Sequence, residues 1–77
     1  MSEIEQFLQN SIEKNTGILI EEANDNILER EVSPLDLLYV IIDIEKNYRV
    51  PAKEILNNIT PDSFTIKQIS MIIAKGN

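Results

Sequence analysis

The side chains that could carry out chemistry in this sequence are almost all carboxylates. Two close pairs, Glu21–Glu22 and Glu29–Glu31, lie in one acidic stretch, and the chain has no histidine and no cysteine. Acid–base catalysis needs a carboxyl group whose pKa is shifted within a cleft, whereas paired acids in an acidic loop are usually solvated. We therefore predict that the protein is not an enzyme and has no catalytic residues.

Residues that could bind a metal ion are equally scarce. Asn24-Asp25-Asn26 supplies oxygen ligands, but the spacing of a calcium-binding loop does not follow it. Without cysteine, neither a thiolate metal site nor a disulfide framework can support the fold. We expect no metal site.

The charges are unevenly distributed along the 77 residues, whose net charge is −6. Residues 1–45 have a balance of −9 and residues 46–77 a balance of +3. The net charge disfavours nucleic acid and anionic membranes as partners. The acidic first part either favours a basic partner or is a solvated surface that keeps the protein soluble.

No stretch approaches the roughly 18 apolar residues of a membrane span, and no basic-then-apolar segment marks a secretion signal. We expect one domain over residues 1–77, in a soluble, cytoplasmic and monomeric protein.

The first of four predicted helices runs from about Glu3 to Asn15. Ser2 and Glu5 have the spacing of a capping box, in which each side chain binds the other residue's backbone N–H. Gly17 is suited to the left-handed conformation that ends a helix.

Residues 18–33 form a predicted loop with no regular period. A loop this rich in apolar residues is expected to lie across the core. Its apolar residues are Ile18, Ile20, Ile27, Leu28 and Val32.

The second predicted helix begins at Ser33 and Pro34, which are favoured at the N-cap and at the first helical position. It continues to about Tyr48, because Pro51 disfavours a helical conformation in the residue before it.

A short third helix is predicted over residues 52–57. The fourth begins at Thr65, where Thr65 and Gln68 form a second capping box and Phe64 and Ile69 a hydrophobic staple. No strand pattern competes with these helices, so the sequence predicts an all-α protein with four helices.

Four short stretches follow one another along the chain: Ser33-Pro34-Leu35-Asp36-Leu37-Leu38, Ile44-Glu45-Lys46-Asn47-Tyr48, Val50-Pro51-Ala52-Lys53-Glu54 and Thr65-Ile66. These stretches and the order of the predicted elements resemble the acyl carrier and peptidyl carrier protein family. In that family, helix two begins with Asp-Ser-Leu-Asp, Ile-Pro precedes the short helix, and Thr-Val begins the last one. The resemblance implies a four-helix acyl-carrier-like bundle with a short third helix and a long loop between helices one and two.

The residue that would carry the family's activity is missing. Leu35 and Asp36 fall on the family's Leu and Asp, which places Pro34 on the serine that holds phosphopantetheine. Proline has no hydroxyl group, so the resemblance implies no cofactor at this position. Ser33 has the nearest hydroxyl group and is the alternative attachment point for 4'-phosphopantetheine. A role as helix N-cap already explains a serine at this position.

The second helix also has more apolar surface than one buried face requires. Leu37, Ile41 and Ile44 fall on one side, the predicted core face, at about 100° per residue. The whole apolar arc exceeds about 200°, although a surface helix usually has a stripe little wider than about 100°. Either the outer part is a protein interface, or the 18–33 loop folds over it. The predicted interaction residues are Leu35, Asp36, Leu38, Tyr39, Ile42 and Lys46.

Three functions follow from these observations. The preferred one is a non-catalytic, carrier-like adaptor or regulatory module in a biosynthetic or peptide-maturation system, whose partner is one of that system's enzymes. The second is a working carrier modified at Ser33, which predicts an apolar channel between helices two and three. The third is a small helical protein unrelated to carriers.

Overall fold

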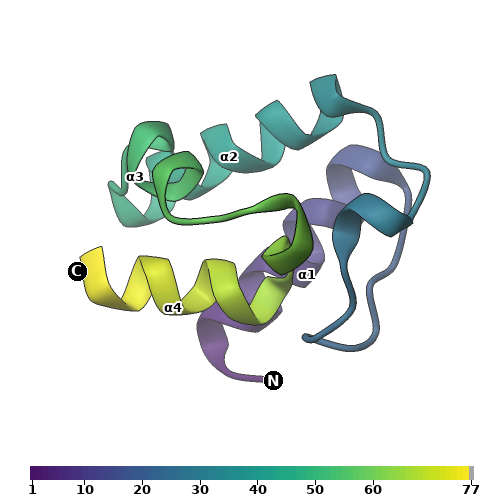
Figure 1. Ribbon diagram of the computed structural model, residues 1–77, viewed down its shortest axis with the longest axis horizontal. Helices are drawn as coiled ribbons and strands as arrows, with labels where there is room; N and C mark the ends of the chain where they lie inside the picture. The colour runs from purple at the N-terminus through teal and green to yellow at the C-terminus, as the bar shows by residue number, and fades with distance from the viewer. Residues whose placement is uncertain (77) are drawn as a thin grey trace.

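The computed structural model describes residues 1–76 as an all-α chain of four helices (Figure 1). The third helix is the shortest and has six residues. These features confirm the predicted all-α class with four helices and a short third helix, and no β-strand occurs in the described range. The elements are α1 (Glu3–Thr16), η1 (Ile27–Glu29), α2 (Pro34–Tyr48), α3 (Ala52–Asn57), η2 (Pro61–Ser63) and α4 (Ile66–Gly76), where η denotes a 3-10 turn.

The helices surround one core. α1 packs against both α2 and α4, and α3 contacts α2 and α4 at one end of the molecule. Figure 1 shows α2 along the top and α4 at the lower left, with α3 on the left between them and the start of α1 at the bottom. The side chains that pack in the core are mostly isoleucines, contributed by all four helices and by the loop that follows α1.

Local capping defines both ends of α1, as predicted. Ser2 Oγ accepts a hydrogen bond from the Glu5 N–H at 3.2 Å, and Glu5 Oε1 accepts one from the Ser2 N–H at 2.9 Å. The hydrogen bond from the Ser2 N–H, together with a smaller contribution from the Ser2 hydroxyl, holds the pKa of the Glu5 carboxyl below its usual value. At the other end, Gly17 has a φ of 77° and its N–H donates to the Glu13 carbonyl.

The long loop between α1 and α2 lies across the core, as its composition predicted. The side chains of Ile20 and Ile27 are fully buried. The Ile27 N–H donates to the Phe64 carbonyl at 2.8 Å, and the Lys67 N–H donates to the Ala23 carbonyl at 2.9 Å. The loop is therefore attached to the start of α4.

At the start of α4, the structure contains one of the two hydrogen bonds of the predicted capping box. Thr65 Oγ1 accepts a hydrogen bond from the Gln68 N–H at 3.0 Å. Ile69 is buried, and the partly buried Phe64 packs against the same core. The helix therefore begins at Ile66, one residue beyond its cap.

The end of α2 is a feature that the sequence did not predict. Arg49 adopts a left-handed conformation, with a φ of 58°, and its N–H donates to the Glu45 carbonyl at 2.9 Å. Glycine is the usual residue in this conformation because other side chains are disfavoured there. The turn positions Val50 as a buried core residue, which links α2 to α3.

Candidate protein-interaction surface

The first turn of α2 is built as the sequence predicted. Ser33 is the N-cap, and its Oγ accepts a hydrogen bond from the Leu35 N–H at 3.3 Å. Pro34 occupies the first helical position, where the missing N–H costs no hydrogen bond. The Ser33 hydroxyl therefore has a structural role at an exposed position.

One side of α2 faces the core. Leu37, Val40, Ile41 and Ile44 are buried, and Tyr48 is half-buried, with its ring in an edge-to-face contact with Phe7 of α1. The predicted core face is confirmed.

The other apolar residues of α2 are exposed to solvent. Leu35, Leu38, Tyr39 and Ile42 retain between 43% and 59% of their accessible surface, and we call these four residues the α2 stripe. Positions i, i+3, i+4 and i+7 lie on one helical face, so the four side chains form a continuous surface. The sequence left open whether the loop covers these residues, and the structure shows that it does not.

Two charged residues of the predicted interface border this stripe. Lys46 is exposed and lies one helical turn beyond Ile42. Asp36 is half-buried and precedes Tyr39 by three positions, at the edge toward the buried face. The structure thus brings together five of the six predicted residues along one exposed side, with Asp36 at its border.

Asp43 fixes the rotation of α2 against α1, a role that the sequence analysis missed. Its Oδ2 accepts hydrogen bonds from Ser11 Oγ at 2.8 Å and Asn15 Nδ2 at 2.9 Å, and lies 3.1 Å from Lys14 Nζ. Burial raises the pKa of the Asp43 carboxyl, but the hydrogen bonds from Ser11, Asn15 and Lys14 outweigh it, so the pKa lies below its usual value. These bonds hold α2 against α1 while the α2 stripe remains exposed.

A polar signal for this contact was present in the sequence. Ser11, Lys14 and Asn15 occur at i, i+3 and i+4, which places them on one face of α1. Such a polar strip beside an apolar one predicts a polar partner on a neighbouring helix.

We predict that Asp43→Ala lowers the free energy of unfolding by about 1–3 kcal/mol at neutral pH, because buried Ser11 loses its acceptor. An aspartate whose pKa is lowered by folding stabilises the protein above the unfolded-state pKa of about 3.9. That contribution is lost as the pH falls through the lower folded-state value. Urea denaturation between neutral and acidic pH measures the difference from the native chain, which should shrink in acid. Exposed Asp62→Asn is the control, and an equal loss in both variants contradicts the assignment.

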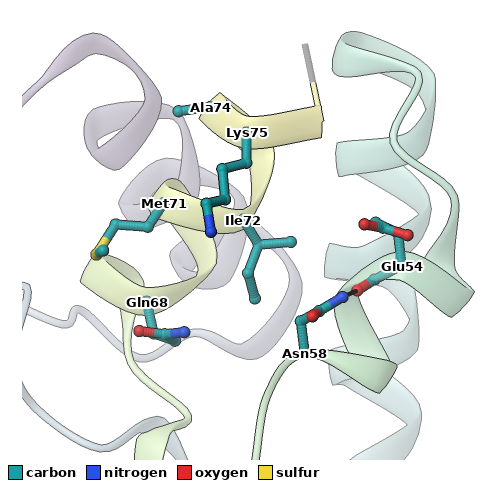
Figure 2. A pocket seen from close by; sticks show the side chains of 7 residues that line it. All are labelled: Glu54, Asn58, Gln68, Met71, Ile72, Ala74 and Lys75. Carbon is teal, nitrogen blue, oxygen red and sulfur yellow. Dashed lines mark hydrogen bonds between the residues drawn. The ribbon is translucent and has the colours of Figure 1, made fainter.

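A groove between α3 and α4 is a further feature of the surface (Figure 2). Its volume is about 310 Å³. It differs in position from the channel between helices two and three that a working carrier predicts. Its lining residues are Glu54, Asn58, Gln68, Met71, Ile72, Ala74 and Lys75.

The described residues thus define a small all-α bundle with an exposed apolar stripe on its second helix. No protein-family model matches the chain, and no match is found among curated proteins or solved structures. Within residues 1–76, no helix has the length and apolar character needed to cross a membrane. The same residues contain no group of three or more histidine, cysteine, aspartate or glutamate side chains placed to bind a metal ion.

Proposed function

We propose that this protein is a non-carrying, acyl-carrier-like interaction module that docks onto a protein partner through the α2 stripe. The observation that supports this proposal is the exposure of four large apolar side chains on one face of one helix. Contiguous apolar surface of this kind is a frequent mark of protein interfaces, and tyrosine is enriched in them.

The proposed setting is a biosynthetic or peptide-maturation system in the cytoplasm, with one of its enzymes as the partner. The order of the helices and the sequence around Ser33 to Leu38 support a carrier-like origin. Pro34 supports the loss of the carrier's chemistry, because it stands where the resemblance places the modified serine. The protein then acts as an adaptor or regulatory subunit without a covalent cofactor.

The shape and charge of the stripe indicate what the partner presents. An apolar surface must cover Leu38, Tyr39 and Ile42, and an acidic group must lie opposite Lys46 to pair with its ammonium. The partner of an ordinary carrier would instead present a basic surface, because the exposed side of the carrier family's second helix is largely acidic.

The alternative carrier function has one observation in its favour. Ser33 is exposed and has a hydroxyl group at the start of α2. That hydroxyl is engaged with the Leu35 N–H, which favours the structural role.

The test of the docking surface is Tyr39→Glu, with Leu28→Glu as a matched control in the loop between α1 and α2. Both side chains are about half exposed, so both variants should fold and show the native circular dichroism spectrum. Placing a charge in the centre of an apolar interface should weaken partner binding by about tenfold or more. Quantitative mass spectrometry of proteins that co-purify with the tagged chains measures the loss. Full recovery of the partner with Tyr39→Glu refutes docking through the stripe.

A further inference from the structure

The groove shown in Figure 2 has an apolar floor, which we define as Met71 and Ile72 of α4. Gln68, Met71, Ile72 and Lys75 occur at i, i+3, i+4 and i+7, so they lie along a single helical face. Ile72 is largely buried and anchors the floor in the core, whereas Met71 is 54% exposed. A methionine side chain is flexible and adapts to different apolar surfaces. The floor therefore suits an aliphatic side chain supplied from outside.

The wall opposite this floor is polar. Glu54 belongs to α3 and Asn58 follows its last residue, and Asn58 Nδ2 donates to the Glu54 carbonyl at 2.7 Å (Figure 2). This bond orients the Asn58 amide and leaves its Oδ1 as an acceptor. Within the described residues, the side-chain amide of Gln68 forms no hydrogen bond, so it offers both a donor and an acceptor.

The groove also has one charge of each sign. Glu54 lies on the α3 side and Lys75 on the α4 side, as Figure 2 shows. Among residues 1–76, the two ion pairs join Lys14 to Asp43 and Arg30 to Asp25. Within this range, neither Glu54 nor Lys75 forms an ion pair. An occupant with a cation near Glu54 and an anion near Lys75 matches both charges.

We propose that this groove binds an extended peptide segment, with one aliphatic side chain on the α4 floor and oppositely charged side chains beside Glu54 and Lys75. A peptide backbone presents both N–H donors and C=O acceptors. These groups match the side-chain amides of Asn58 and Gln68 at the rim. A fatty acid would pair with Lys75 but leave Glu54 and both amides without partners. Nucleic acid is disfavoured by the net charge of −6.

This site is additional to the docking surface of the proposed function. The α2 stripe and the groove share no residue, and they lie on different helices. One chain can therefore contact an enzyme through α2 and hold a peptide between α3 and α4. The peptide-binding inference does not require the stripe to be a docking surface, so the two can be tested separately.

The test is a nuclear magnetic resonance titration of the isotope-labelled full chain with blocked peptides. In an extended peptide, alternate side chains point to the same side. Acetyl-Lys-Ala-Leu-Ala-Glu-amide therefore presents the two charges and the leucine together, and acetyl-Glu-Ala-Leu-Ala-Lys-amide presents them in the reverse direction. We expect one of these peptides to cause saturable shifts at the backbone amides of Glu54, Gln68 and Met71. Replacing its leucine by serine should weaken binding by about tenfold.

Two variants and a lipid probe make the outcome decisive. Met71→Glu should abolish the peptide-induced shifts, and Tyr39→Glu should leave them unchanged. Unaltered peptide binding by Met71→Glu would overturn the proposal. So would shifts caused by decanoate but by neither peptide, or no shifts from any probe at millimolar concentration. If Tyr39→Glu loses the protein partner but keeps the peptide, both sites stand. If it keeps both, only the α2 docking surface is refuted.

Discussion

Ile27→Ala is expected to lower the free energy of unfolding by about 2–5 kcal/mol, the usual cost of removing a large aliphatic side chain from a core. Ile27 lies in the loop between α1 and α2, yet its side chain is fully buried. The total stability of a small domain is about 5–15 kcal/mol, so this single change is expected to remove a large part of it. Denaturation in urea, followed by circular dichroism, measures the difference.

The neighbouring residue supplies the matched control. Leu28 is in the same 3-10 turn but is 43% exposed, so Leu28→Ala should cost less than about 1 kcal/mol. Because the two substitutions remove similar side chains from adjacent positions, their difference reports burial rather than turn propensity. Equal losses would mean that the loop does not pack into the core as the structure shows.

This pair also shows where sequence reasoning about the fold ends. The composition of the loop indicated that it lies over the core, but it did not separate Ile27 from Leu28. That choice depends on contacts with distant residues, such as the hydrogen bond from the Ile27 N–H to the Phe64 carbonyl. The helix starts at Ser2 and Ser33 were predictable because their capping bonds join residues two or three positions apart.

The candidate surface was predictable only in part, for the same reason. Helical periodicity alone places Leu38 and Ile42 on one face of α2, away from the core face. Whether another segment covers that face is decided by tertiary contacts, and here the loop turns toward α4 instead. The role of Asp43 was missed because it depends on which face of α1 is turned toward α2.

Arg49 marks a different limit. A left-handed residue that ends a helix is recognisable in a sequence when it is glycine, as at Gly17. An arginine gives no such signal in a sequence, because non-glycine residues rarely adopt the left-handed backbone conformation. The next residue, Val50, is buried in the core, a tertiary contact that local sequence patterns do not reveal.

The strongest test of the proposed carrier-like origin is to place a serine at position 34, where the resemblance puts the carrier's modified serine. Pro34→Ser is expected to make the chain a substrate for a broad-range phosphopantetheinyl transferase with coenzyme A, whereas the native chain should keep its mass. Position 34 is exposed at the start of α2, and Ser33 remains available as the N-cap. A serine is also well tolerated in the first turn of a helix, so the fold should persist. Intact mass spectrometry after incubation measures the adduct, with an authentic carrier protein modified in parallel.

Ser33 is the residue that makes this experiment discriminating. Modification of Pro34→Ser should survive the additional change Ser33→Ala, because the new hydroxyl is the attachment point. If the native chain itself gains a pantetheine adduct that Ser33→Ala removes, the protein is a carrier with a displaced attachment site, and the non-carrying function is wrong. If neither the native chain nor Pro34→Ser is modified, the transferase does not recognise α2 as the second helix of a carrier protein. Position 34 would then not be equivalent to the carrier serine, and the α2 stripe would have to be explained without a carrier ancestry.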